Sequence, residues 1–496
     1  MFENVKPEQV GVSSCDIKKY ISILENARLS THSIIMMRHG KVFYENYWKP
    51  FDENFLHRMY SVSKSFVSIA VGFLEQDGLI SLDDKIIDYF DADITENACE
   101  TVKMQTIRNM LMMSTGYPWI HSWWFGQKPA DRLKHYFDSS SFEGGIRRIP
   151  GTIFEYDSMG SFVLGSMVEE VTGKSLMEYL REKLFDKIGV SKEAYCLKCP
   201  GGHSWGDSAI LCTARDLAKV LLFVMNKGEW MGEQILNREY LETAASSLID
   251  TNEGDFGPNS YGYGYQIWRT RDNSFYFNGM GCQYAIAIPD KDMVFVINSD
   301  NQGNVTAAST IINPFFEIVA NNASDEPIAE NEKAYDELVK YSESLSLFAL
   351  KGGVESSMQD KINGKLFKMN ENPMGITEIK LVFEGGKGVL EYKNAQGDKK
   401  LYFGMEENAF GVFPQEGYAD MVGTEFAAGN YYKCAASAMW TQDDKMEIAV
   451  QAIDKYFGRL LMRFEFPDEN TIAVNMNKAA EDFFDEYSGY ADGKAE

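Results

Sequence analysis

The stretch His57-Arg58-Met59-Tyr60-Ser61-Val62-Ser63-Lys64-Ser65-Phe66 decides how this chain is interpreted. Ser61 and Lys64 are three residues apart, so a helix over 61–76 places both side chains on one face of its first turn. A serine hydroxyl becomes an effective nucleophile when a base takes its proton, and a buried lysine can be that base. The positive end of the helix favours the alkoxide that develops. Taken alone, the spacing also fits an N-cap serine and a surface lysine.

The pattern on either side of this stretch predicts an α+β domain. A strand pair at 33–37 and 41–45 flanks the turn Arg38-His39-Gly40, and a second hairpin joins 284–289 to 293–298. The run 263–268 alternates as a further strand would. Helices are expected at 15–27, 61–76, 106–113, 161–170, 214–226 and 313–319, the last with Asn313 as N-cap and Pro314 at its first position. A helical insertion therefore interrupts an antiparallel sheet whose strands come from both ends of the domain.

The last third of the chain has a different composition. A linker-like run at 321–327 precedes a charged helix at 330–346, and short β-type runs begin after Lys361. About eight short strands joined by tight turns predict a meandering barrel or sandwich. We therefore expect an α+β domain at 1–325, a helical linker at 326–350 and an antiparallel β-barrel at 351–496.

The charge balance limits the class of partner. The chain has 73 acidic and 48 basic residues, a formal net charge of −25 and a pI near 4.8. Phosphates and anionic lipids attract basic surfaces, so neither nucleic acid nor a membrane is the expected partner. Seven scattered cysteines are typical of reduced thiols rather than of a disulfide framework. With no signal peptide and no membrane-length apolar run in view, we expect a cytoplasmic protein.

Three further motifs follow the first one along the chain. They are Thr106-Ile107-Arg108-Asn109-Met110-Leu111-Met112-Met113-Ser114-Thr115-Gly116, Pro150-Gly151-Thr152-Ile153-Phe154-Glu155-Tyr156-Asp157-Ser158 and Phe277-Asn278-Gly279. In this order they resemble the serine β-lactamase and penicillin-binding-protein superfamily, and most of all its class C β-lactamase-related branch, the CubicO group. The resemblance spans roughly residues 5–320. It implies an α+β domain with an all-helical insertion and a serine hydrolase that works through an acyl-enzyme.

The resemblance also implies roles for single residues. Ser61 matches the nucleophile that becomes acylated, and Lys64 matches the adjacent base. Tyr156 matches a tyrosine that passes a proton to the leaving group and activates the deacylating water. Ser158 stands where the family has an asparagine and keeps one hydrogen-bonding group there. The backbone amides of Ser61 and Met280 would form the oxyanion hole.

The third motif departs from the family pattern. Asn278 and Gly279 match the second and third positions of a Lys-Thr-Gly or His-x-Gly element, where Gly279 lets the backbone approach the substrate. Phe277 replaces the positively charged or imidazole residue that helps to hold a substrate carboxylate. This exchange shifts the expected substrate from β-lactams to a neutral amide or ester, and it leaves peptidase, esterase and amidase activity open. It also leaves open a catalytically silent binding, sensor or scaffold protein on the same fold.

The resemblance implies no metal and no organic cofactor, and it implies a small-molecule or peptide substrate. The β pattern after residue 351 resembles the lipocalin-like barrels attached to some family members. Such a barrel would cover the cleft or make oligomer contacts, so homo-oligomer formation stays open.

Three shorter motifs point to other chemistry, each with a defect. Cys196 and Cys199 near His203 lack the second cysteine pair of a zinc site. Gly173-Lys174-Ser175 lacks the first glycine of a phosphate-binding loop. Gly202-His203-Ser204-Trp205-Gly206 matches a nucleophile elbow, but Cys-Pro-Gly precedes it instead of a buried strand, and no histidine follows it. A Ser-His-Asp hydrolase is therefore a minor alternative.

Overall fold

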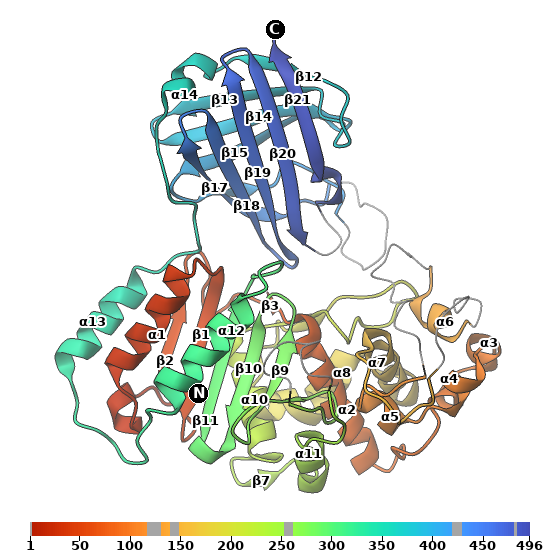
Figure 1. The fold of residues 1–496 in the computed structure, drawn as a ribbon. Coiled ribbons are helices and arrows are strands. Elements are labelled where there is room, and N and C mark those ends of the chain that lie inside the picture. The colour runs from red at the N-terminus through yellow and green to blue at the C-terminus, as the bar shows by residue number, and fades with distance from the viewer. Residues whose placement is uncertain (1, 117–129, 139–147, 252–260, 419–428, 481–483) are drawn as a thin grey trace. The chain divides into compact units, whose positions relative to one another are not determined.

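The computed structural model describes residues 2–116, 130–138, 148–251, 261–418, 429–480 and 484–496. They form two compact units, one made of residues up to Ser346 and one that begins at Leu347 (Figure 1). The first unit is α+β, and the second is built on a large β-sheet with the short helix α14 (Ser357–Ile362). The domain limits expected at 325 and 350 stay a prediction.

An antiparallel sheet forms the centre of the first unit. Its strand order is β2-β1-β11-β10-β9-β8, so strands from the two ends of the unit pair in the middle through β1 and β11. The strands are β1 (Thr31–Arg38), β2 (Lys41–Tyr47), β8 (Trp268–Arg269), β9 (Phe275–Gly279), β10 (Gln283–Ile288) and β11 (Met293–Ser299). The α+β class expected from the sequence is confirmed, and so are both hairpins.

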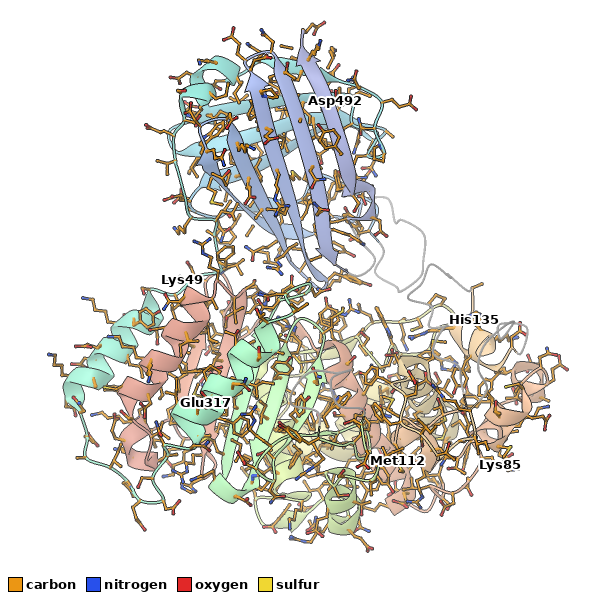
Figure 2. All side chains as sticks on the ribbon, viewed as in Figure 1. Lys49, Lys85, Met112, His135, Glu317 and Asp492 are labelled. Carbon is orange, nitrogen blue, oxygen red and sulfur yellow. The ribbon has the colours of Figure 1, made fainter. Side chains whose placement is uncertain are left out.

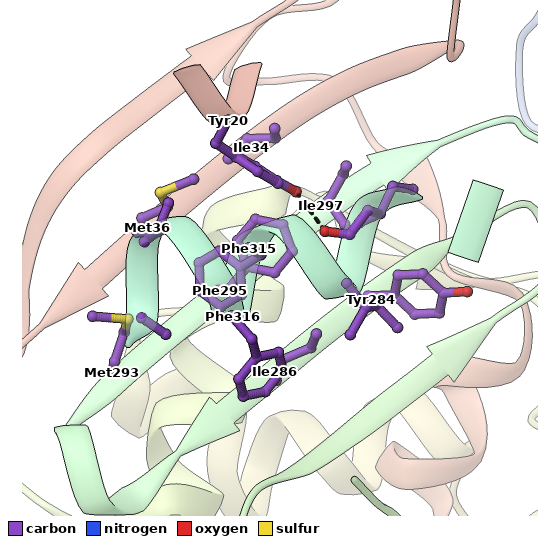
Figure 3. Close-up of a cluster of buried hydrophobic side chains, with 14 of the residues drawn as sticks. Tyr20, Ile34, Met36, Tyr284, Ile286, Met293, Phe295, Ile297, Phe315 and Phe316 are labelled. Carbon is purple, nitrogen blue, oxygen red and sulfur yellow. Dashed lines mark hydrogen bonds between the residues drawn. The ribbon is translucent and has the colours of Figure 1, made fainter. Parts of the chain in front are cut away.

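Helices cover this sheet on both faces, which is why β10 and β11 are buried along their whole length. Helices α1 (Ser14–Asn26) and α12 (Ala307–Pro314) and the π-helical turn η9 (Phe315–Ala320) lie on one face, and α10 (Ala214–Met225) packs on the other. Figure 3 shows the first of these interfaces, where Phe295 stacks on Phe315 at 4.1 Å and the Tyr20 hydroxyl donates to the Ile311 carbonyl at 3.2 Å. Strands β10 and β11 are accordingly mostly apolar, as strands covered on both faces require.

The helical insertion packs around α7 (Ser158–Thr172), which, among the described residues, contacts the 3₁₀ helix η3 (Ile86–Tyr89) and four other α-helices. These four are α2 (Ser63–Gln76), α5 (Ile107–Leu111), α6 (Arg132–Phe137) and α8 (Leu176–Leu180). The other helices in the described part of the unit are η1 (Pro7–Val10), η2 (Tyr60–Val62), α3 (Ala92–Thr95), α4 (Glu100–Met104), η7 (Arg181–Phe185), α9 (Asp186–Ile188), α11 (Arg238–Ala244), η8 (Pro289–Lys291) and α13 (Glu332–Glu343). Its short strands are β3 (His57–Arg58), β4 (Tyr195–Cys196), β5 (Ile210–Cys212), β6 (Glu229–Trp230) and β7 (Glu233–Gln234).

The strand expected at 263–268 is wrong over most of its length, because only Trp268 belongs to a strand. The backbone N–H groups of Tyr265 and Gln266 donate to Ala244 and Leu111, which belong to the helical insertion, instead of to a neighbouring strand. Gln266 also adopts a left-handed backbone with φ of 57°. The alternating aromatic residues therefore reflect packing against helices.

The helix expected at 313–319 also begins elsewhere. Helix α12 starts at Ala307, so Asn313 and Pro314 lie inside it and not at its N-terminus. Proline has no N–H to donate, and the hydrogen-bond register changes from α to π at this point, where η9 follows. The exposed Glu317 of η9 carries a label in Figure 2.

The second unit is a closed barrel of nine strands with β16 as an extra strand beside β17. The sheet order is β15-β14-β13-β12-β21-β20-β19-β18-β17-β16, and a parallel pairing between β15 and β17 closes the ring. Its strands are β12 (Leu366–Met369), β13 (Glu378–Glu384), β14 (Lys387–Asn394), β15 (Gly397–Met405), β16 (Ala409–Val412), β17 (Lys433–Gln442), β18 (Lys445–Ile453), β19 (Phe457–Asp468), β20 (Thr471–Ala480) and β21 (Gly489–Ala495). The predicted all-β barrel is confirmed.

Alternation along the barrel strands separates its two faces. In β13, for example, Ile379, Leu381 and Phe383 are buried while the residues between them are partly exposed. Asp492 of β21, labelled in Figure 2, is exposed. This period of two places apolar side chains inside the ring and polar ones outside.

Across the parts of the chain that the structure describes, none of the helices combines the length and the apolar character needed to cross a membrane.

Candidate active site

Ser61 lies in the 3₁₀ turn η2, immediately before helix α2. The sequence predicts that Ser61 belongs to the α-helix itself, and this prediction is wrong. The residue before Ser61, Tyr60, has a left-handed backbone with φ of 48°, which a side chain other than glycine rarely adopts. Such a conformation costs on the order of 1–3 kcal/mol and persists where the surroundings enforce it. The enforcement comes from Ile210, whose carbonyl accepts from the Met59 amide at 2.9 Å and whose amide donates to the Ser63 hydroxyl at 3.1 Å.

Lys64 meets Ser61 as the sequence predicts. Its Nζ lies 2.9 Å from the Ser61 Oγ, and it also donates to the backbone carbonyl of Asp207 at 2.7 Å. Lys64 is only 1% exposed, whereas Ser61 is half-buried and so is reachable from solvent. A surface lysine is therefore excluded, and a buried amine faces the hydroxyl of an accessible serine.

The carboxylate of Asp207 forms an ion pair on its other side. Both of its oxygens accept from the Arg132 guanidinium, at 2.9 and 3.2 Å, and both side chains are fully buried. Burial lowers the pKa of the Arg132 guanidinium, but the Asp207 carboxylate and the Cys199 thiol together outweigh this effect, so the pKa lies above its usual value. Neither residue belongs to a motif that the sequence analysis identified.

Tyr156 joins the same group from the segment that precedes α7. The Nζ of Lys64 lies 5.1 Å from the centroid of its ring, and the ring stacks on Trp268 with centroids 5.8 Å apart and planes inclined by 22°. Three residues that are far apart in sequence, Ser61, Lys64 and Tyr156, therefore converge around one amine. Trp268, which supports the tyrosine ring, was missed by the sequence analysis.

The start of α7 holds the residues that follow Tyr156. Asp157 caps the helix by accepting from the Gly160 amide at 2.9 Å and from the Thr115 hydroxyl at 2.7 Å. Burial raises the pKa of Asp157, although these hydrogen bonds oppose the effect. Ser158 is the first residue of the helix and is half-buried. The rigid cap thereby fixes the position of both Tyr156 and Ser158.

Strand β9 approaches the nucleophile turn closely, and Gly279 permits this approach. A Cβ atom at Gly279 would lie 2.4 Å from the Met59 carbonyl oxygen, closer than any real contact. Met280 follows in the turn to β10 and is 39% exposed. The side chain of Gln283 fixes this turn, because its Nε2 donates to the carbonyls of Met280 at 2.9 Å and of Ser299 at 2.6 Å.

Asn278, the remaining predicted site residue, lies one position before Gly279 on β9 and pairs in register with Tyr284. Its side chain is half-buried. The structure thus places the predicted residues on η2, on α2, at and just before the start of α7, and on β9 and the turn that follows it. The chemical roles assigned to them stay predictions.

The shorter motifs hold parts of the fold together. Ser204 is buried and donates to the Glu169 carboxylate at 2.6 Å, and His203 contacts the same carboxylate at 3.0 Å, so the histidine is not aligned on the serine as a base. Gly173 ends α7 and Ser175 caps α8, which makes that motif a corner between helices. In the described part of the chain, no three His, Cys, Asp or Glu side chains gather as they would around a metal ion.

Comparison with known proteins finds one family and several relatives. A family model described as Beta-lactamase matches residues 22–312, which is more than half of the chain. A 6-aminohexanoate-dimer hydrolase from Paenarthrobacter ureafaciens is 25% identical over 271 residues, covering 51% of this chain and 67% of the hydrolase.

Two solved structures share the fold. A protein described as a candidate 6-aminohexanoate-dimer hydrolase from Bacillus anthracis is 21% identical with a TM-score of 0.51, over 64% of this chain and 87% of that one. The octameric penicillin-binding protein homologue from Pyrococcus abyssi is 16% identical with a TM-score of 0.51, over 96% of this chain and 100% of that one. The second likeness extends over both units, so the predicted combination of a β-lactamase-like domain and a C-terminal barrel is confirmed.

Proposed function

Because the chain belongs to the Beta-lactamase family, we propose that it is a serine hydrolase that cleaves a neutral amide or ester through an acyl-enzyme. The observation that carries this proposal is the 2.9 Å contact between the buried Lys64 Nζ and the Ser61 Oγ. A buried amine at this distance can take the hydroxyl proton as the oxygen attacks a carbonyl carbon.

In the proposed reaction the Ser61 Oγ attacks the substrate carbonyl while its proton passes to Lys64. The backbone amides of Ser61 and Met280 bind the oxyanion of the tetrahedral intermediate. Tyr156, which lies against the same amine, passes the proton to the departing amine or alcohol. Water then attacks the ester on Ser61 with help from the same groups, and the acid product leaves.

The environment of strand β9 supports a neutral substrate. Phe277 is fully buried, so this position of β9 carries an apolar ring and no cation that could pair with a substrate carboxylate. The net charge of −25 likewise gives the protein as a whole no attraction for anions. The relative called 6-aminohexanoate-dimer hydrolase is named for a substrate other than a β-lactam.

A serine-directed phosphonate probe tests the proposal. The wild type is expected to become labelled at Ser61, and Ser61→Ala is expected to stay unlabelled at the same probe concentration. Equal labelling of the two proteins would refute the assignment of the nucleophile. A panel of esters, amides, D-amino-acid peptides and a chromogenic β-lactam then distinguishes turnover from acylation without release, and the latter would indicate a sensor.

We also propose that the chain forms a homo-oligomer through its barrel. Strand β16 supports this, because over the residues that the structure describes its one partner strand is β17, and it exposes the apolar side chains of Phe410 and Val412 by more than half. The homologue from Pyrococcus abyssi that matches both units is octameric. Light scattering of the whole chain provides the test, and a particle of 56.2 kDa at micromolar concentration would contradict it.

A further inference from the structure

The ion pair behind Lys64 is buried among two sulfur atoms and an aromatic ring. Besides Asp207, the Arg132 guanidinium contacts the Cys199 Sγ at 3.3 Å, the Met159 Sδ at 3.1 Å and the face of the Phe162 ring at 4.5 Å. An arginine at the surface would have water as an alternative partner, but this one is fully buried. Its planar fork is therefore held in one orientation by the two oxygens of a single carboxylate.

Asp207 connects this pair to the reacting groups through its backbone. Its carboxylate binds Arg132 while its carbonyl accepts from the Lys64 Nζ at 2.7 Å, a contact slightly shorter than that between Lys64 and Ser61. The next residue, Ser208, is fixed as well, because its carbonyl accepts from the Arg58 Nε at 3.2 Å. The carbonyl that orients the amine therefore belongs to a segment clamped by two buried arginines.

We propose that Arg132 and Asp207 are positioning residues for the hydrolase reaction proposed above, acting on Lys64 in two ways. The pair fixes the carbonyl that points the Lys64 amine toward Ser61. It also pairs the buried Asp207 carboxylate with a cation, so that this negative charge is not left uncompensated beside the Lys64 amine.

The second effect follows from the low polarity of the surroundings. Charges interact far more strongly in a protein interior than in water, and a carboxylate without a partner is stabilised by any nearby cation. Other ionisable groups also act on this cluster. They are Tyr156 against Lys64, Asp157, Cys196 and Cys199 against Asp207, and Arg148 against Asp157. Among these, Asp157 adds negative charge, so removal of Arg132 would leave the Asp207 carboxylate without its ion-pair partner, while its carbonyl stays bound to the Lys64 amine.

Single and double replacements distinguish the two effects. Arg132→Met is expected to slow phosphonate labelling of Ser61 at least tenfold and to move the acid limb of its pH profile upward by about one unit. Arg132→Lys keeps the charge but loses the two-pronged contact, so labelling should slow without a shift of the pH profile. Arg132→Met combined with Asp207→Leu removes both charges, a change that buried ion pairs often tolerate. The double variant should return the pH profile to that of the wild type.

Arg215→Met serves as the matched control. Arg215 forms a two-pronged pair with Glu45, at 2.7 and 2.6 Å, outside the site described above. Its loss should lower the thermal midpoint while the labelling rate and its pH profile stay those of the wild type.

The outcomes separate this inference from the proposed function on which it rests. If the wild type is not labelled, or Ser61→Ala is labelled equally, the hydrolase proposal fails. A second outcome is that the wild type is labelled as expected, while a correctly folded Arg132→Met variant is labelled at the same rate and with the same pH profile. In that case the pair is structural only, and the inference is overturned. Should Arg132→Met not fold, Arg132→Lys and Asp207→Asn carry the test. Both are expected to slow labelling at least threefold, and wild-type rates in both would overturn the inference.

Discussion

Acid should destabilise the first unit through His57, four residues before Ser61 in the chain. His57 is almost fully buried, its Nδ1 lies 2.9 Å from the Arg58 carbonyl oxygen, and its Nε2 lies 2.8 Å from Nδ1 of His32. A carbonyl can only accept, so Nδ1 of His57 carries the proton and its Nε2 accepts from His32. Burial lowers the pKa of His57 to about 3, although the hydrogen bond to the backbone opposes the shift.

The sign and size of the effect follow from this lowered pKa. In the unfolded chain the histidine takes up a proton near its ordinary pKa of 6.5, whereas in the folded chain it stays neutral down to about pH 3. Between these values the unfolded state binds more protons, so stability falls as the pH falls. One pKa unit corresponds to about 1.4 kcal/mol, so at pH 4.5 His57 should have removed about 2.7 kcal/mol relative to a pH well above 6.5.

The variant His57→Asn isolates this contribution. Asparagine does not titrate, and its amide can still donate to the Arg58 carbonyl. Urea unfolding followed by tryptophan fluorescence near neutral pH and near pH 4.5 should show the wild type losing about 2.7 kcal/mol more than the variant. Phe51→Leu is the control, because Phe51 stacks on His32 at 4.1 Å and its replacement weakens the same cluster without removing the titrating group. Equal losses in wild type and His57→Asn would refute the reasoning.

Two replacements at the candidate site give further predictions. Gly279→Ala forces a Cβ atom to within 2.4 Å of the Met59 carbonyl, so the strand or the nucleophile turn must shift; we expect a loss of about 1–3 kcal/mol in urea unfolding and slower phosphonate labelling of Ser61. Labelling at the wild-type rate would show that β9 does not support the nucleophile. Tyr156→Phe keeps the ring that stacks on Trp268 but removes the hydroxyl, so ester turnover should fall on the order of 100-fold with an unchanged thermal midpoint. An unchanged turnover would exclude a proton-transfer role for this tyrosine.

Local patterns were sufficient for much of the fold. Both hairpins of the first sheet could be predicted because each turn lies between two apolar runs that pair with each other, as β10 does with β11. Strand β21 is harder to predict, because it contains Gly489 and Gly493 and few residues that favour strands. It is a strand because β12 and β20 pair with its two edges. Such pairing depends on distant segments and leaves no local pattern in the sequence.

The same division between local and distant contacts applies to the site. The contact of Ser61 with Lys64 could be predicted because a spacing of three residues brings two side chains together in any helical turn. The approach of Tyr156 and Gly279 followed only from the family resemblance, since no local rule places them near Ser61. The pair of Arg132 and Asp207 could not be predicted at all, because the two residues are 75 positions apart and each resembles an ordinary surface charge in the sequence.

This last case explains what the nucleophile needs beyond its own motif. Tyr60 would not by itself hold a left-handed backbone, and Lys64 would not by itself leave water, so both must be held by contacts formed elsewhere. These contacts come from one segment, where Ile210 binds the turn around Ser61 and Asp207 binds the amine. A chain that carried the Ser-x-x-Lys motif without such a segment would place the same two residues in an ordinary helix with the lysine in solvent. The motif is therefore necessary for the proposed chemistry, whereas the segment from Asp207 to Ile210 decides whether the lysine is buried against the serine.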